Sequence, residues 1–203
     1  MIINGLFPTP VVKFELGREL TEQEMKLLMG YRQERNQGNS ASEERYVLKD
    51  KKLRGLKLYV EQCLSKYVES IYAPSDLFQL TITQSWVNYT NQNEFHHRHK
   101  HPNSMVSGVF YVNADESTDK IHFFKDEPDS FKVFTDNYNL FNSDSWWFAV
   151  KTGDMVLFPS YLTHMVETVQ SVNTRVSLAF NTFPTGNLGK LKESCKLVIR
   201  GVE

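Results

Sequence analysis

Histidines are concentrated in one short stretch of the chain. Four of the six fall within His96-His97-Arg98-His99-Lys100-His101, and a fifth, His164, lies far downstream. Imidazole nitrogen is a ligand for Fe, Zn, Cu and Ni, and alternate residues of an extended chain point to the same side. A His-x-His pair and a distant third histidine would form a metal site with open coordination positions. A solvated histidine-rich loop is the alternative that this spacing leaves open.

A polar strand face follows 11 residues after His164. In the expected strand 174–183, alternation separates an apolar face from a mixed one, which consists of Arg175, Ser177, Ala179 and Asn181. An arginine among small side chains leaves room for a bound molecule, and the guanidinium group binds carboxylates through two parallel hydrogen bonds. The face therefore suits a small dicarboxylate, although an exposed face with an edge salt bridge explains the pattern equally well.

The elements that must position these groups are mainly strands. From about Leu77 onward the hydrophobic period is two, and Asn, Asp, Gly, Ser and Pro clusters separate the segments. The strands that we expect are 79–89, 104–113, 120–125, 131–135, 146–151, 154–159, 163–170 and 174–183. Many short strands without intervening helices indicate a sandwich, jelly roll or barrel rather than a parallel sheet. His122 alternates with Ile121 and Phe123 in one of these strands, which favours a structural role.

The first 75 residues have mainly helical patterns. Thr21 and Glu24 form a capping-box pair ahead of one helix, and Asp50 is placed to cap a second helix that stops before Pro74. Between them, the polar stretch 36–44 predicts a surface loop. We expect the helices to pack on the outside of the sheet in a single domain.

Composition excludes several classes of function. The formal net charge is −1 with 23% charged residues, which argues against a surface built for nucleic acid and against disorder. There is no apolar run of about 18 residues and no signal-peptide pattern at the N-terminus. Two cysteines are too few for a disulfide framework or a thiolate metal site. These features predict a soluble protein of the cytoplasm that does not bind membranes.

Four motifs in order resemble a known family. They are His99-x-His101-Pro-Asn-Ser, then Ser107-Gly-Val-Phe-Tyr-Val, then Leu157-Phe-Pro-Ser-Tyr-Leu-x-His164, then Arg175-Val-Ser-Leu-Ala-Phe-Asn. The series resembles the iron(II)/2-oxoglutarate oxygenases, in particular the type found in marine bacteria and their phages. The resemblance implies a mainly β (α+β) fold, a double-stranded β-helix or jelly roll with N-terminal helices on the outside of one sheet. It spans a single oxygenase-like domain, 1–203, with mostly helical support over 1–75, a jelly-roll core over 76–185 and a C-terminal extension over 186–203.

The resemblance also implies roles for six residues. His99, His101 and His164 would hold Fe(II) as the catalytic metal. Arg175, with Ser177 beside it and Tyr111 as a further contact, would bind the distal carboxylate of 2-oxoglutarate. The expected activity is a dioxygenase that uses O2, releases succinate and CO2 and hydroxylates a C–H bond, with ascorbate as a stimulating reductant.

One feature departs from the wider superfamily, in which the metal ligands are two histidines and a carboxylate two residues after the first histidine. No acidic residue stands two positions after any histidine of the cluster. Either three imidazoles bind the metal, or a carboxylate such as Glu94 or Asp126 reaches in. The pair His97 and His99 competes with His99 and His101, which we prefer because it directly precedes Pro102-Asn-Ser.

Two other functions stay open at this point. One is a cupin-like three-histidine dioxygenase that does not use 2-oxoglutarate, and the other is a non-catalytic jelly-roll binding module. The sequence does not identify the substrate, which could be a small molecule or a protein side chain, or the oligomeric state.

Overall fold

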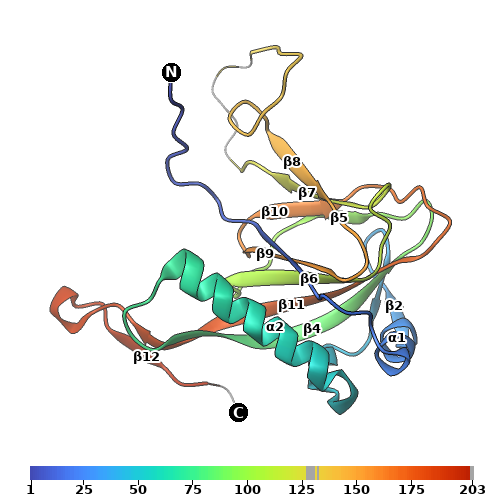
Figure 1. Cartoon of the computed structure of the whole chain (residues 1–203), viewed down its shortest axis with the longest axis horizontal. Coiled ribbons are helices and arrows are strands. Elements are labelled where there is room, and N and C mark those ends of the chain that lie inside the picture. The colour runs from blue at the N-terminus through green and yellow to red at the C-terminus, as the bar shows by residue number, and fades with distance from the viewer. Residues whose placement is uncertain (127–130, 132, 202–203) are drawn as a thin grey trace.

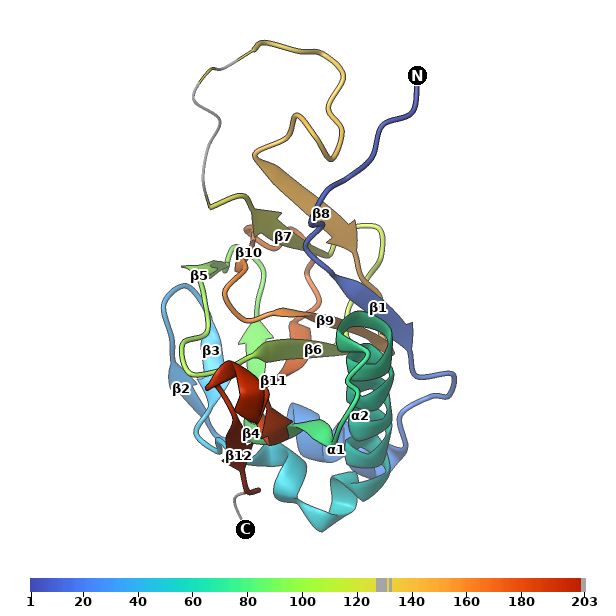
Figure 2. The same cartoon turned by 90° about the vertical axis from the view of Figure 1, so that its left-hand side faces the viewer.

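Two antiparallel β-sheets face each other in the computed structural model, which describes residues 1–126, 131 and 133–201 (Figures 1 and 2). The larger sheet has the order β1-β9-β6-β11-β4-β3-β2, with β12 paired to β11, and the smaller has the order β5-β10-β7-β8. The larger consists of β1 (Val12–Glu15), β2 (Gln33–Arg35), β3 (Ser40–Ser42), β4 (Phe78–Thr90), β6 (Val106–Asn113), β9 (Asp154–Pro159), β11 (Arg175–Leu188) and β12 (Leu197–Ile199). The smaller consists of β5 (His96–His99), β7 (Lys120–Phe124), β8 (Ser145–Ala149) and β10 (Thr163–Val166). This is the predicted jelly-roll architecture.

Helices cover the outer face of the larger sheet (Figures 1 and 2). They are α1 (Glu22–Met29), α2 (Arg54–Tyr67), the 3-10 turns η1 (Val47–Lys49) and η2 (Lys51–Leu53), and the π-helical turn η3 (Val68–Tyr72). A further 3-10 turn, η4 (Leu191–Glu193), lies in the projecting connection between β11 and β12 and buries no residue. The buried stripe of α2, which includes Leu56 and Val60, packs in one core with Phe110 of β6 and Leu178 and Phe180 of β11. Because side chains alternate along a strand, the residues between these on β6 and β11 face the smaller sheet.

The helix starts agree with their sequence signals. The Thr21 hydroxyl accepts a hydrogen bond from the Glu24 backbone N–H, and the Glu24 carboxylate accepts one from the Thr21 backbone N–H. The Asp50 carboxylate accepts a hydrogen bond from the Lys52 backbone N–H at η2, which leads directly into α2. Both predicted caps are therefore present, and they fix where the two supporting helices begin.

Several strands differ from the prediction. In the expected strand 131–135, the described residues 131 and 133–135 are not extended in a sheet, and residue 132 lies outside the described part. The expected strand 163–170 ends at Val166, whereas β11 runs on to Leu188. The first 75 residues supply β1, β2 and β3 in addition to helices, so this segment contributes more to the larger sheet than its sequence predicts. Of the C-terminal extension 186–203, residues 202 and 203 lie outside the described part.

The stretch 36–44 is not the predicted surface loop. It contains β3, which pairs with β4, and Ala41 and Ser42 are buried there. The Ser42 hydroxyl accepts a hydrogen bond from the Val87 backbone N–H and donates one to the Glu44 carbonyl. Polar side chains that satisfy neighbouring backbone groups allow this segment to be buried despite its composition.

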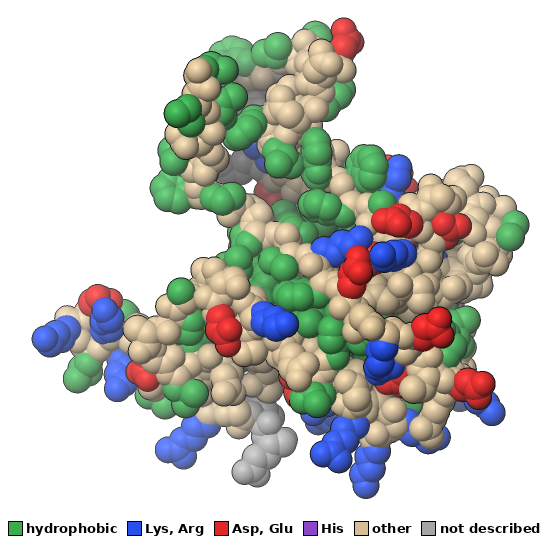
Figure 3. All heavy atoms as spheres, viewed as in Figure 1, with side chains coloured by type: hydrophobic (Ala, Val, Ile, Leu, Met, Phe, Trp, Pro, Cys, Tyr) green, Lys and Arg blue, Asp and Glu red, His purple; other side chains and the backbone are tan. Residues whose placement is uncertain are grey.

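Large apolar side chains gather on the part of the molecule that projects beyond the smaller sheet (Figure 3). They come from β8 and from the described residues before it, and they include Phe131, Phe134, Tyr138 and Trp147. Among the helices in the described part of the chain, none has the length and apolar character that crossing a membrane requires.

Gly108 provides a test of the packing between β6 and β11. A Cβ atom there would lie 2.1 Å from Cζ of Phe180, which is fully buried in the core and cannot swing away. We expect Gly108→Ala to lower the free energy of unfolding by about 1–3 kcal/mol through overpacking, measured by thermal or urea unfolding. Gly55→Ala in α2 is the matched control, because its Cβ would meet only ordinary contacts at 3.7 Å and helices favour alanine. Equal melting temperatures for Gly108→Ala and the wild type would contradict this account of the core.

Candidate metal centre and cosubstrate pocket

The pairing of β5 with β10 brings the distant histidines together. In this antiparallel pair, His164 lies directly opposite His99, and their ring centroids are 4.3 Å apart. His101 follows β5, and its backbone N–H donates a 3.0 Å hydrogen bond to the Ser160 carbonyl just before β10. As a result, Nε2 of His101 lies 3.2 Å from Nε2 of His164.

Hydrogen bonds from the opposite ring nitrogens orient two of these imidazoles. Nδ1 of His99 lies 2.7 Å from the His97 carbonyl, and Nδ1 of His164 lies 3.0 Å from the Leu162 carbonyl. A carbonyl can only accept a hydrogen bond, so each Nδ1 carries the proton and each Nε2 presents a lone pair. This is the arrangement in which a neutral histidine binds a metal ion, with its second nitrogen anchored to the protein.

Burial keeps the same imidazoles uncharged. Desolvation lowers the pKa of His101 to about 3 and holds the pKa of His164 well below its ordinary value, and the neighbouring histidines lower both further. The pKa of His99 is also lowered, mainly by desolvation. At neutral pH these groups are therefore free bases that can bind a cation without first releasing a proton.

The three side chains fit one metal ion. One nitrogen from each of His99, His101 and His164 lies within 4.8 Å of the others. Two nitrogens bound at right angles to one ion at about 2.1 Å are about 3 Å apart, close to the 3.2 Å between His101 and His164. A second grouping, His96, His97 and His99, shares His99 but takes all its members from β5. Only the first grouping includes a histidine from another strand, which supports the predicted pair His99 and His101.

Neither acidic candidate completes the centre. The Glu94 carboxylate pairs with Arg35 and accepts hydrogen bonds from Asn91. The Asp126 carboxylate accepts hydrogen bonds from Lys100 Nζ at 2.8 Å and from the Thr163 hydroxyl at 2.6 Å. Within the described residues no carboxylate joins either histidine grouping. In the described part of the chain, the candidate centre is therefore made of imidazoles alone.

One cavity between the sheets contains all six residues that the sequence singles out. His99, His101 and His164 line one side of it, while Tyr111 of β6 and Arg175 and Ser177 of β11 line the other. The predicted polar face of β11 thus faces the histidines. His122 is also buried, but it lies in neither histidine grouping, and its Nε2 is 3.4 Å from the Glu167 carboxylate.

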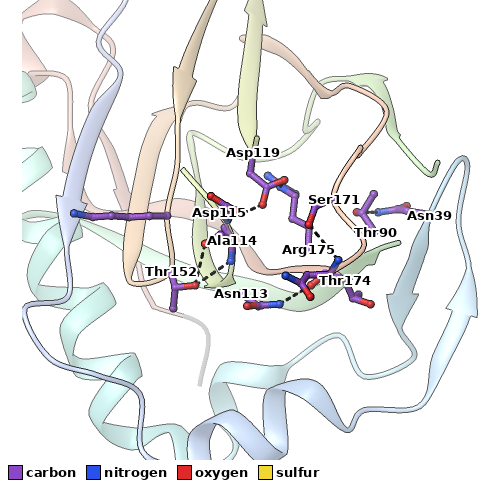
Figure 4. A network of polar contacts seen from close by, with 12 residues as sticks. Asn39, Thr90, Asn113, Ala114, Asp115, Asp119, Thr152, Ser171, Thr174 and Arg175 are labelled. Carbon is purple, nitrogen blue, oxygen red and sulfur yellow. Dashed lines mark hydrogen bonds and ion pairs between the residues drawn. The ribbon is translucent and has the colours of Figure 1, made fainter. Parts of the chain in front are cut away.

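Arg175, which stands beside Asp119 in Figure 4, has unused hydrogen-bonding capacity among the described residues. Only 3% of the residue is exposed, its Nε has no hydrogen-bond partner among the described residues, and its guanidinium carbon lies 5.1 Å above the Tyr111 ring. The buried Tyr111 hydroxyl also has no partner there. Desolvation raises the pKa of Tyr111 to about 12, so the hydroxyl remains a hydrogen-bond donor at neutral pH. A buried guanidinium beside a free O–H is a receptor for a carboxylate.

The sequence reasoning missed His96 as a residue of the site. His96 lines the cavity with its ring stacked 4.5 Å from that of His99. Trp86 and Asn88 of β4 line it too, and the alternation along strand 79–89, which places both on one face, is the sequence signal that points to them. Asp119, 4.0 Å from Arg175, stands just before β7 and has no such signal.

Comparison with known protein families shows what kind of domain contains the candidate site. Residues 84–181 match the family described as "Putative 2OG-Fe(II) oxygenase". All six candidate site residues lie within that segment. The chain carries a 2OG-Fe(II) oxygenase domain. It therefore depends on Fe(II), 2-oxoglutarate and O2, and the family match favours this activity over the cupin-like enzyme and the binding module. No curated protein matches the sequence.

Solved structures support the fold of the oxygenase. An oxidoreductase of the 2OG-Fe(II) oxygenase family from Burkholderia pseudomallei is 14% identical, with a TM-score of 0.58 over 85% of this chain and 83% of that chain. HygX from Streptomyces hygroscopicus, solved with nickel, 2-oxoglutarate and hygromycin B, is 10% identical, with a TM-score of 0.58 over 86% and 82%. A prolyl-4-hydroxylase from Pseudomonas putida is 12% identical, with a TM-score of 0.53 over 85% and 92%. The fold is the predicted double-stranded β-helix.

The geometry predicts which histidines bind metal. His164→Ala or His101→Ala should lose most of the single Fe(II) per chain, because each removes one of three converging nitrogens. His97→Ala is the matched control and should keep the metal, since His97 lies outside the grouping that includes His164. Metal analysis of anaerobically loaded protein measures both, with circular dichroism to verify folding. If His97→Ala lost the metal and His101→Ala retained it, the ligand pair would be His97 and His99 instead of His99 and His101.

Proposed function

We propose that His99, His101 and His164 hold the catalytic Fe(II) and that Arg175, with Ser177 and Tyr111, binds the distal carboxylate of 2-oxoglutarate. The observation that carries this proposal is the cavity itself. Three neutral imidazoles converge on one side of it, and on the other stands a buried arginine whose Nε has no hydrogen-bond partner among the described residues. A dicarboxylate with a keto acid at one end can bridge two such groups, whereas a simple metal-binding module has no use for the arginine.

The protein's contribution is to bind and orient the metal and 2-oxoglutarate. The bound metal with O2 supplies the oxidation of 2-oxoglutarate to succinate and CO2, which this family couples to hydroxylation. The Nδ1 hydrogen bonds of His99 and His164 keep their rings in the ligating orientation. Arg175 holds the far end of the cosubstrate, which fixes the direction of the keto acid. The apolar neighbours Val109, Ile121 and Val166 line the same cavity and exclude water from it.

Ser177 and Tyr111 assist Arg175. Ser177 lies two residues along β11 from Arg175 on the same face, and both residues are buried. The Tyr111 hydroxyl would donate to the carboxylate oxygen that the guanidinium leaves unpaired. A dry pocket strengthens each of these hydrogen bonds, because water does not compete for the carboxylate.

We also infer a cytoplasmic location. Cys63 and Cys195 are both free thiols in the structure. Free thiols persist in reducing compartments, and Fe(II) is the reduced form of the metal that the enzyme requires.

Removing the arginine tests the cosubstrate site. Loss of a charged partner in a desolvated pocket costs about 2–5 kcal/mol, so Arg175→Ala should weaken 2-oxoglutarate binding by roughly two orders of magnitude or more. Arg175→Lys should recover little, because an ammonium group cannot form the paired hydrogen bonds. Ser177→Val should have a milder effect. Anaerobic calorimetric titration of the iron-loaded protein measures each affinity.

The matched control is Arg98→Ala, which removes the same charge from an exposed residue of β5 that stacks on Phe124 outside the cavity. It should leave 2-oxoglutarate affinity nearly unchanged, and Fe(II) content should stay at the wild-type level in all four variants. The proposal fails if the iron-loaded wild type does not bind 2-oxoglutarate even at millimolar concentration.

A further inference from the structure

Among the residues that the structure describes, Arg175 has one acidic neighbour, and both residues are buried. Asp119 lies just before β7, 5% exposed, with Oδ1 4.0 Å from Nε of Arg175, which is 3% exposed (Figure 4). At that distance the two groups attract each other without a hydrogen bond, and Nε has no hydrogen-bond partner in the part of the chain that the structure describes. The contact is thus a buried ion pair that leaves the hydrogen-bonding capacity of the guanidinium free.

The chain holds Asp119 in place independently of Arg175. Its Oδ2 accepts a 2.8 Å hydrogen bond from the Asp115 backbone N–H. Its own backbone N–H donates to the Asp115 carbonyl at 2.7 Å, and its carbonyl accepts from Val150 at 3.1 Å. Arg175 in turn rests against the Tyr111 ring. Because each side chain has its own support, Asp119 acts on the arginine through its charge alone.

The sum of the charges in the occupied pocket explains what a carboxylate at Asp119 would do. In the wider superfamily the carboxylate ligand contributes one negative charge beside the metal, and among the described residues this centre has only neutral imidazoles. A divalent metal and Arg175 would together carry three positive charges against the two negative charges of 2-oxoglutarate. Asp119 adds the missing negative charge, so that the occupied pocket is neutral as a whole.

We propose that Asp119 is the internal counter-ion of Arg175: it neutralises the empty carboxylate site and restrains its affinity for 2-oxoglutarate and succinate. This inference rests on the proposed cosubstrate role of Arg175. Both dicarboxylates present a distal carboxylate to the same guanidinium, and Asp119 repels each of them. A counter-ion that is always present therefore favours release of succinate after turnover.

Asp119→Asn is the direct test, because asparagine keeps the shape and an oxygen that can accept from Asp115. We expect the iron-loaded variant to bind 2-oxoglutarate and succinate about tenfold more tightly, measured by anaerobic calorimetry. The metal-free variant should melt several degrees below the wild type, because its buried arginine has lost its partner. Saturating 2-oxoglutarate should raise the melting temperature of the iron-loaded variant more than that of the wild type. Glu116→Gln, which removes the same charge from an exposed residue of the same turn, is the control and should show none of these effects.

A double-mutant cycle in metal-free protein separates an electrostatic role from a merely structural one. In Arg175→Ala the buried Asp119 is itself unpaired, so adding Asp119→Asn should raise the melting temperature instead of lowering it. This comparison remains available if Asp119→Asn alone does not fold. The inference is overturned if Asp119→Asn lowers the melting temperature equally in both backgrounds, or if it weakens or does not change dicarboxylate binding. Failure of the wild type to bind 2-oxoglutarate would instead overturn the proposed function, and the melting cycle would still report on the ion pair.

Discussion

The register between β5 and β10 is the constraint on which the candidate metal centre depends. Pairing sets His99 opposite His164, and a bulge beside that pair shifts the register so that Val166 lies opposite His96 instead of His97. Because side chains of a strand alternate between faces, a slip of one residue would turn His99 away from the cavity and bring its neighbours Arg98 or Lys100 into it. A cationic side chain there would exclude a metal ion. The strand pairing therefore determines the chemistry of the cavity as well as its shape.

Desolvation connects the two halves of the cavity. It keeps the imidazoles of His101 and His164 neutral, as their lowered pKa values show. It also makes each unpartnered polar group costly, which applies to Nε of Arg175 and to the Tyr111 hydroxyl. A dicarboxylate would bring negative charge to the arginine and electron pairs to a metal held by the imidazoles. It would thus use both halves of the cavity at once. The desolvation that makes the empty site unfavourable thus also favours a dicarboxylate as its ligand.

The residues of the site could be predicted where the sequence alternates regularly between the two faces of a strand. Alternation along β11 placed Arg175 and Ser177 on the inner face correctly, and the His-x-His spacing indicated two side chains on one side. The strand β5 itself could not be predicted, because His, Arg and Lys have no apolar face to mark a period. The Ser-Ala-Ser strand β3 could not be predicted for a related reason. Its serines have no apolar side chain to mark a period, and the Ser42 hydroxyl is buried because it forms hydrogen bonds with backbone groups. Asp119 shares no period with Arg175, and only the folded chain brings the two together.

Acidic residues support this site from outside the imidazole grouping. Asp126 accepts hydrogen bonds from Lys100, which stands between His99 and His101, and from Thr163, which precedes His164. One carboxylate thus ties together the two segments that carry the candidate ligands, at the position where each enters the cavity. On the opposite wall the charge of Asp119 faces Arg175, and each of these two side chains has its own support. Where the candidate ligands are all neutral, negative charge beside them and beside the anion receptor offsets the nearby cationic groups. It does so without occupying a coordination position, which leaves those positions to the cosubstrate and O2.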